Sequence, residues 1–399
     1  MMRGRLEDIV MFSTADWTSQ YWTNKQHMAA RLAARGHRVL YVETVGLRRP
    51  RMNRKDAGRM AARLSRGLVP PAQVRDNLWV LSPLTVPVGQ RHRAIYTFNR
   101  WQLRTRIRSW MRKQKITRPL IWTYHPYMLE AAEALDPSMI VYHCVDDVGA
   151  VPGVDRMTFE PAERRLIARA DLTFATSRQL QERCAAVAGS RSHYFGNVAD
   201  IAHFARARDI GVLPSELAAL PRPRLGYVGA LSDFKIDFAL LETLVAAHRD
   251  WQFVFIGDQR EGQRSDAVAR LTRHANVHFL GWRPYRQLPE YMAGLDIGLL
   301  PLLINDYTRS VFPMKFFEYL AAGLPVVSTA LPALRDFASV YSAAGDSTAV
   351  VDAISSALAG RGPAPLAADD PLLQANSWDT RLDQMMAIID VTPRRPAAD

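Results

Sequence analysis

Short apolar strands alternate with amphipathic helices in two successive series along this chain. The first series opens with a strand over residues 8–13, continues in a helix over 24–34 that stops at Gly36, and returns to a strand over 37–43. A glycine just past the last apolar turn is a common helix C-cap. Strands separated by helices need crossover connections, which build parallel sheets. The first half of the chain is therefore predicted to be a Rossmann-like, doubly wound α/β domain.

The second series begins near Arg224 and has the same character. Strands are predicted over residues 225–229, 252–257, 277–280, 297–301 and 325–328, and helices over 237–247 and 314–322. Residues 206–224 show no clear periodicity and are predicted to be a linker. The resulting domains are 1–205 and 206–375, followed by a helix over 376–390 and a disordered tail over 391–399. Two doubly wound domains in sequence predict a central cleft between the carboxyl ends of their sheets.

Composition indicates a cytoplasmic protein. The chain has 399 residues, of which 48% are apolar, so two cores can be filled. No apolar run reaches the roughly 18 residues of a membrane-spanning helix, and the apolar stretch at the start is too short for a signal-peptide core. Cys144 and Cys184 have neither metal-ligand nor disulfide-framework spacing, as expected in a reducing compartment.

The positive charge is confined to the first half. Residues 1–200 contain 32 Lys and Arg against 17 Asp and Glu, whereas the remainder contains 19 against 22. Such asymmetry predicts an anionic partner, either membrane lipid, nucleic acid or an acidic substrate. No recognisable nucleic-acid-binding module is present, so nucleic acid is not expected.

Two segments concentrate this charge. The basic residues of the first are Arg48, Arg49, Arg51, Arg54, Lys55, Arg59, Arg63 and Arg66. The second, residues 95–116, predicts an amphipathic helix whose apolar residues Trp101, Ile107, Trp110 and Met111 alternate with basic ones. This pattern predicts a helix lying on the anionic inner face of the cytoplasmic membrane. The alternative is a packed helix whose arginines are solvated.

The strongest local motif is residues 307–328, Tyr-Thr-Arg-Ser-Val-Phe-Pro-Met-Lys-Phe-Phe-Glu-Tyr-Leu-Ala-Ala-Gly-Leu-Pro-Val-Val-Ser. A loop here feeds a helix, and a helix N-terminus favours an anion such as a diphosphate. Lys315 is well placed for a bound phosphate. Glu318 lies on the same face and could accept hydrogen bonds from ribose hydroxyls. The alternative is a surface Lys–Glu pair on an ordinary helix.

This motif resembles GT-B glycosyltransferases, in particular the retaining family 4 group. Glu318 matches the second Glu of the family's Glu-x7-Glu pattern, and Ser310 replaces the first, which contacts the donor sugar. The resemblance therefore implies donor-sugar contacts for Ser310, Val311 and Phe312. Residues 313–321 are also similar to a Pro-x-Lys-x-x-Glu-Tyr-Leu-Ala pattern of bacterial polysaccharide transferases of the teichuronic acid type.

Two further matches extend the implied donor site. Lys235 stands at the family's spacing from Gly229, although Ala230 replaces an Arg that binds the diphosphate. Arg309 could supply that second cation, because guanidinium groups chelate phosphate. The family's nucleobase-binding turn falls on Gly281, Trp282 and Arg283. Lys235 could instead be a solvated charge, and Trp282 a core aromatic residue.

In the first domain, the candidates follow predicted strands. Asp146 and Asp147 lie at the carboxyl end of the strand over 138–145, where sites in these folds collect, and we expect them to bind sugar hydroxyls. One of them could instead cap a helix. His125 and His143 are further catalytic candidates. The aromatic loop over 16–22 and the helix that follows predict an acceptor site with Trp17, Gln26 and His27.

The resemblance implies transfer of a sugar from a UDP- or GDP-linked donor to a glycan or lipid-linked acceptor, with retention of configuration. The final helix would return to the first domain, and the product would be a cell-surface polysaccharide. No cofactor is expected, and no metal, because no Asp-x-Asp occurs in the chain and cations can stabilise the leaving diphosphate. The alternatives are a GT-B sugar-nucleotide epimerase and a non-catalytic GT-B scaffold protein.

Overall fold

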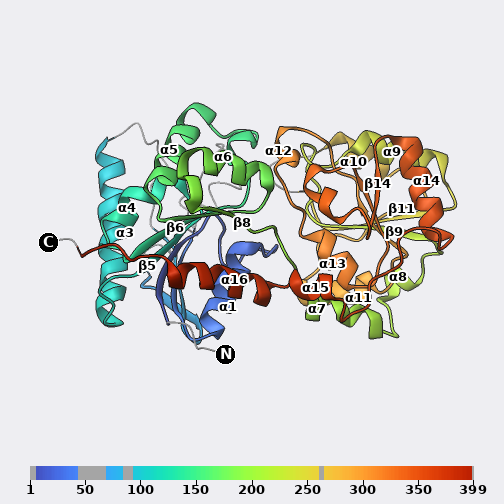
Figure 1. Ribbon diagram of the computed structural model, residues 1–399. Coiled ribbons are helices and arrows are strands. Elements are labelled where there is room, and N and C mark those ends of the chain that lie inside the picture. Colours follow the sequence, from blue (N-terminus) through green and yellow to red (C-terminus); the bar gives the residue numbers. More distant parts are fainter. Residues whose placement is uncertain (1–5, 44–68, 84–92, 260–264, 398–399) are drawn as a thin grey trace. The chain divides into compact units, whose positions relative to one another are not determined.

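A computed structural model describes residues 6–43, 69–83, 93–259 and 265–397. The chain divides into two compact units, the first comprising Met1–Phe195 with Leu382–Asp399 and the second Gly196–Arg381. The boundary expected after residue 205 thus lies inside the second unit. Each unit is built on a parallel or mainly parallel sheet with helices on both faces, which confirms the predicted α/β class (Figure 1).

Within the described residues, the sheet of the first unit has eight strands in the order β3-β4-β2-β1-β5-β6-β7-β8. Its strands are β1 (Asp8–Phe12), β2 (Arg38–Val42), β3 (Ala72–Arg75), β4 (Leu78–Leu81), β5 (Leu120–Thr123), β6 (Met139–Cys144), β7 (Leu172–Ala175) and β8 (Ser192–Tyr194). Among the strands of the described residues, β3 alone pairs antiparallel, with β4. The chain order reverses between β1 and β5, so the carboxyl ends of these two strands form a topological switch point, where ligands of doubly wound folds bind.

Helices cover both faces of this sheet. They are α1 (Asn24–Ala34), α3 (Arg93–Lys113), α4 (Leu129–Glu133), α5 (Arg156–Arg169), α6 (Arg178–Ala188) and the end of α16 (Trp378–Val391). Helices α5 and α6 lie on one face, and α1 lies on the other beside α16. Arg35, the C-cap residue of α1, forms an ion pair of 2.6 Å with Asp383 of α16.

Helix α3 turns most of its apolar residues inward. Ile107, Trp110 and Met111 are buried in the core of the first unit, so the expectation that they lie in a lipid headgroup layer is wrong. Phe98 and Trp101, by contrast, are 47% and 55% exposed. The predicted basic cluster over 48–66 lies outside the described residues. No helix within the described ranges is long and apolar enough to span a bilayer.

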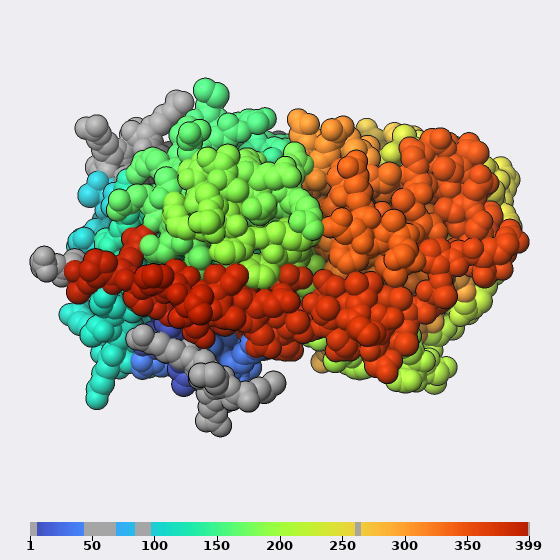
Figure 2. All heavy atoms as spheres, viewed as in Figure 1, coloured from blue at the N-terminus to red at the C-terminus, as the bar shows by residue number. Residues whose placement is uncertain are grey.

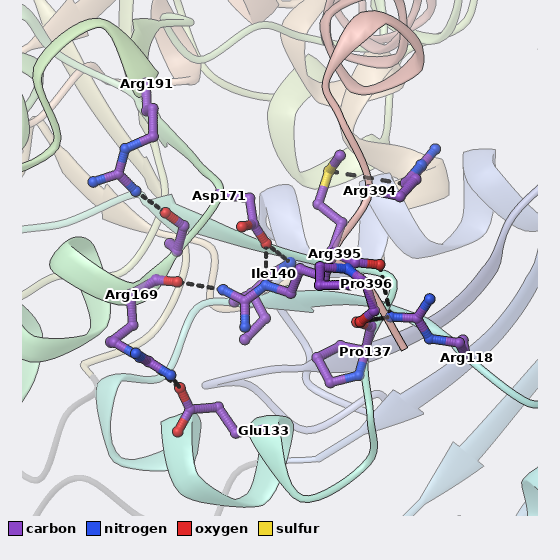
Figure 3. A network of polar contacts seen from close by, with 12 residues as sticks. Arg118, Glu133, Pro137, Ile140, Arg169, Asp171, Arg191, Arg394, Arg395 and Pro396 are labelled. Atoms are coloured by element: carbon purple, nitrogen blue, oxygen red, sulfur yellow. Dashed lines mark hydrogen bonds and ion pairs between the residues drawn. The ribbon is translucent and has the colours of Figure 1, made fainter. Parts of the chain in front are cut away.

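The structure describes the chain up to residue 397 and assigns residues 391–397, which were predicted to be a disordered tail, to the first unit. The segment lies along the surface of the first unit (Figure 2) and binds at the amino ends of its strands (Figure 3). The Arg395 guanidinium pairs with Asp171 at 2.6 Å, and its backbone N–H donates to the carbonyl of Ser138. Arg394 pairs with Glu7. These partners come together only in the folded sheet, so the sequence could not reveal the anchor.

The sheet of the second unit has six parallel strands in the order β11-β10-β9-β12-β13-β14. Numbered within the unit this is 3-2-1-4-5-6, the Rossmann order. The strands are β9 (Arg224–Val228), β10 (Gln252–Ile256), β11 (Val277–Phe279), β12 (Ile297–Leu300), β13 (Val326–Thr329) and β14 (Ser342–Ala344). The switch point lies between β9 and β12.

The helices of this unit are α7 (Ile201–Ala205), α8 (Ser215–Ala218), α9 (Phe238–Ala247), α10 (Asp266–Leu271), α11 (Leu288–Met292), α12 (Asp306–Arg309), α13 (Lys315–Ala321), α14 (Ser347–Leu358) and α15 (Pro371–Ala375). Helix α13 packs so closely on β12 that a Cβ at Gly298 would lie only 2.5 Å from the Tyr319 ring. The segment predicted as a linker is packed as well. Arg208 donates to the carbonyls of Leu320 and Ala321 at the end of α13, and Leu217 is fully buried.

Candidate active site

The carboxyl edge of the second sheet brings two of the predicted donor residues together. Gly229 follows β9 with a φ of 152°, a region that favours glycine. A Cβ at this position would lie 3.0 Å from the Tyr227 hydroxyl and 3.4 Å from Cε of Lys315. The side chain of Lys315 therefore lies directly over the turn after β9, at the switch point of the sheet.

Lys315 and Glu318 form an ion pair whose two side chains differ in exposure. The Nζ atom of Lys315 lies 3.6 Å from Oε2 of Glu318, and the two side chains are 26% and 3% exposed. Oε2 has no hydrogen-bond partner among the residues that the structure describes. Burial raises the pKa of Glu318, and the charge of Lys315 opposes that shift. This is not a solvated surface pair but a buried acceptor beside an accessible cation, an arrangement that suits a ligand with both hydroxyls and phosphate.

Lys235 adds a second cation to this edge. Its ammonium lies 5.0 Å from the ring centroid of Phe234 and 5.3 Å from that of Tyr307, so the loops that follow β9 and β12 pack together around it. Its backbone carbonyl accepts a hydrogen bond of 2.8 Å from Leu303. Arg309 is exposed at the end of α12, two residues beyond Tyr307. The loops after β9 and β12 thus carry the two other predicted phosphate cations.

The loop between α12 and α13 is fixed by Asn197, whose side-chain amide donates to the carbonyl of Phe312 at 2.8 Å. Ser310 is 1% exposed, and its hydroxyl is without a hydrogen-bond partner in the described part of the chain. Val311 is half-buried. The Phe312 ring, predicted to contact the donor sugar, is instead buried in the core, where it stacks on Phe317. Of the three residues, Ser310 is the best placed to bind a sugar.

The turn after β11 is held by Asp258, which follows β10 and accepts a hydrogen bond of 3.2 Å from the Trp282 N–H. Gly281 enters this turn with a φ of 73°. The Arg283 side chain donates to Tyr291 and pairs with Glu216 of α8 at 3.0 Å. It therefore anchors α8 to this turn.

Glu216 and Asp258 are structural supports that sequence reasoning missed. A hydrogen bond from Tyr291, strengthened by Arg283, lowers the pKa of Glu216 to about 2. Neither carboxylate belongs to a motif, and each meets its partner only through the strand order. The one available signal for Asp258 was its place directly after a predicted strand.

The adjacent carboxylates of the first unit have separate partners. Asp146 lies 3.7 Å from the ammonium of Lys25, and Asp147 lies 2.9 Å from the guanidinium of Arg183. Arg183 also pairs with the buried Glu163. The side chain of Asp147 makes no capping hydrogen bond to the short 3-10 helix that it precedes, Val148–Ala150, so the capping alternative fails for this residue. Lys25 and Arg183 were not predicted.

His125 and His143 differ in their surroundings. His125, directly after β5, is 1% exposed, and within the described structure neither ring nitrogen has a hydrogen-bond partner. Burial lowers its pKa to about 4, so the imidazole is neutral near pH 7. His143 instead lies within β6, accepts a hydrogen bond from Trp122 and stacks on Tyr124. The structure places His125 at the carboxyl edge and His143 in the core, which corrects the prediction for His143.

The predicted acceptor residues are mostly structural. Gln26 is fully buried, where it completes the N-terminal cap of α1 and donates to the carbonyl of Asp16. His27 is buried against Trp22. Trp17 is half-buried, and Arg75 lies over its ring at 5.7 Å. Trp17 is thus the one of the three that the structure leaves near the surface.

Comparisons with known proteins show which families and folds this chain resembles. The model of the family described as glycosyl transferases group 1 matches residues 222–360, the part that contains the donor-side residues. TuaH of Bacillus subtilis (strain 168), named as a teichuronic acid biosynthesis glycosyltransferase, is 31% identical over 193 residues. That match spans 47% of this chain and 47% of TuaH, so less than half the length of the relative is compared.

Solved structures resemble nearly the whole chain. Sucrose-phosphate synthase from Thermosynechococcus elongatus has a TM-score of 0.66 at 18% identity, covering 96% of this chain and 98% of its own. The UDP-forming trehalose-phosphate synthase of Burkholderia vietnamiensis has a TM-score of 0.68 at 14% sequence identity, and the match covers 98% of both chains. Anabaena HepE in complex with UDP-glucose has a TM-score of 0.62 at 16% sequence identity, and the match covers 96% of this chain and 99% of HepE.

The fold is therefore that of the GT-B glycosyltransferases, two Rossmann-like units in one chain. Within it, residues 222–360 are the part that matches the model of the group 1 glycosyl transferases.

Proposed function

We propose that this chain transfers a sugar from a nucleoside diphosphate sugar to a glycan or lipid-linked acceptor. The observation that carries the proposal is the buried Glu318 carboxylate beside Lys315, placed over the Gly229 turn at the switch point of the second sheet. Glu318 binds the ribose hydroxyls, and Lys315 and Lys235 bind the diphosphate, with Arg309 as a third cation. The backbone of Gly281, Trp282 and Arg283 binds the nucleobase.

UDP is the proposed nucleotide. It is supported by the UDP and UDP-glucose complexes of HepE, which has the same fold. The name of TuaH supports a role in the synthesis of a cell-surface polysaccharide. The sugar is transferred with retention, and no metal is needed, because lysine ammonium groups and the first turn of α13 stabilise the leaving diphosphate.

The chain works at the inner face of the cytoplasmic membrane, bound there by its first unit. Helix α3 supports this proposal with Phe98 and Trp101, which are exposed, and with Arg104, Arg108 and Arg112, which are exposed along the same helix. Aromatic side chains next to arginines suit the headgroup layer of an anionic membrane. A lipid-linked acceptor would be presented at that surface.

A thermal-shift screen tests the donor directly. A ligand that binds only the native state raises its stability by RT ln(1 + [L]/Kd), so the melting temperature should rise most with UDP and UDP-sugars and least with ADP. A transfer assay with the best donor then separates an enzyme from a scaffold that binds without turnover. Failure of UDP, GDP and ADP alike to stabilise the chain would contradict the donor site.

A further inference from the structure

Asp146 and Asp147, the two carboxylates after β6, differ in exposure and in partners, which indicates different roles. The side chain of Asp146 is 33% exposed, whereas its partner Lys25 is only 8% exposed and lies behind it. Asp147 is 19% exposed, and its partner Arg183 also binds Glu163 at 3.3 Å. Glu163 accepts a further hydrogen bond of 2.5 Å from Tyr142. Asp147 therefore belongs to an internal network between β6, α5 and α6, and Asp146 is the carboxylate that a ligand can reach.

Lys25 lies at the switch point of the first sheet. It is the second residue of α1, which begins after the loop that follows β1. Its ammonium is 5.8 Å from the ring centroid of Tyr124, directly after β5, and pairs with Asp146 beyond the end of β6. Strands β5 and β6 lie next to one another, and β1 pairs with β5, so these residues meet at one carboxyl edge.

Helix stability does not explain a lysine at this position. A cation in the first turn of a helix is opposed by the helix dipole, which favours anions there. Burying an ammonium group also costs free energy unless a counter-charge accompanies it. Asp146 supplies that counter-charge, and the pair has the geometry of a fixed carboxylate with a cation at its back.

We infer that Lys25 is a positioning residue, whose ammonium fixes the Asp146 carboxylate so that it accepts a hydrogen bond from a sugar hydroxyl of the substrate. The inference rests on the proposed transferase function. A hydrogen bond to a carboxylate is roughly twice as strong as one between neutral groups, so a fixed carboxylate orients a hydroxyl effectively. The hydroxyl belongs either to the donor sugar or to the acceptor.

A double-mutant cycle in the full chain tests this role. Lys25→Met removes the charge at similar length, and Asp146→Asn removes the charged acceptor. Each is expected to lower kcat/KM about ten- to hundredfold, the loss of one charge-assisted hydrogen bond. Because Lys25 acts through Asp146, the double variant should be no slower than Asp146→Asn alone. The donor KM and the acceptor KM, measured separately, identify which substrate carries the hydroxyl.

Arg35→Met is the matched control, since Arg35 caps the other end of α1 and pairs with Asp383. It should keep wild-type turnover, and all variants should keep the wild-type Kd for UDP and melt in one cooperative transition, which shows that each of them is folded. Wild-type kcat/KM in Lys25→Met, or losses that multiply in the double variant, would overturn the inference while leaving transfer established. A wild-type chain that transfers no sugar would instead contradict the proposed function, and this inference with it.

Discussion

The ammonium of Lys315 lies 3.6 Å from the carboxylate of Glu318, yet 26% of the lysine side chain is exposed and only 3% of the glutamate side chain. An exposed pair at this spacing stabilises a helix by about 0.2–0.5 kcal/mol and leaves both groups in water. Here the carboxylate is removed from water, and Oε2 finds no hydrogen-bond donor within the described residues. The ionised form therefore costs stability in the absence of a ligand, as expected of a group that is placed to bind one.

Glu318→Gln is expected to raise the melting temperature near pH 7. Burial raises the pKa of Glu318 above its unfolded value of about 4.3. Below the unfolded-state pKa, the protonated carboxyl contributes its full stability to the folded protein. This contribution is lost as the pH rises through the higher pKa of the folded state. The difference in melting temperature between variant and wild type should thus grow from about pH 4 upward. A difference that stays constant across the series would contradict a buried, ionising Glu318.

Arg395→Ala is expected to lower the free energy of unfolding of the first unit by about 1–3 kcal/mol, because it leaves Asp171 without its charged partner. Urea unfolding measures the loss. The matched control is Arg156→Ala, whose exposed ion pair with Glu160 is worth about 0.5 kcal/mol or less. Equal effects of the two substitutions would show that the tail is not an anchor.

Membrane binding is expected to depend on helix α3. Vesicles that contain phosphatidylglycerol should sediment the protein at low salt, and rising salt should release it, because each basic residue near an anionic surface adds about 1 kcal/mol. Charge reversal at Arg104, Arg108 and Arg112, or Trp101→Ser, should abolish sedimentation.

The control for net charge is reversal of three exposed arginines of helix α5, namely Arg156, Arg164 and Arg165. This variant should still bind. Equal binding to neutral phosphatidylcholine vesicles, or equal losses from the α3 and α5 reversals, would rule out a specific docking surface on α3.

Transfer is expected to continue in excess EDTA. In the proposed donor site, Lys235 and Lys315 would provide the positive charge that a metal ion otherwise supplies to a leaving diphosphate. Initial rates with and without chelator should differ by no more than about twofold. Losing a charge-assisted contact would lower the rate by much more than that. Inactivation by EDTA that magnesium or manganese reverses would contradict a metal-free reaction.

Most of the fold was predictable from the sequence, because most strands are short apolar runs and several helices have their own cap or stop signal. Helix α1 begins at Asn24 and ends before Gly36 as expected, and α13 ends before Gly323. The edge strands β3, β8 and β14 were missed. Their residues are largely exposed or half-buried, so no apolar run marks them.

The candidate site was predictable only where a motif carried it. Lys315 and Glu318 stand on one helix, and their spacing alone placed them on one face. Lys25 and Asp146 are far apart in the sequence, and only the order β1-β5-β6 brings them together. His143 and Phe312 were misassigned because a residue type shows nothing of the direction of its side chain. Both point into cores that other strands and helices complete.

The most direct test of the donor site is calorimetric titration of the nucleoside diphosphate that stabilises the wild-type chain most. Lys315→Met and Glu318→Gln are each expected to weaken its Kd about ten- to hundredfold, because each removes one charged contact with the ligand. Arg270→Met, which breaks an exposed ion pair with Glu242 in the same unit, should leave the Kd unchanged. Wild-type affinity in both Lys315→Met and Glu318→Gln would contradict the assignment of this edge as the nucleotide-sugar site.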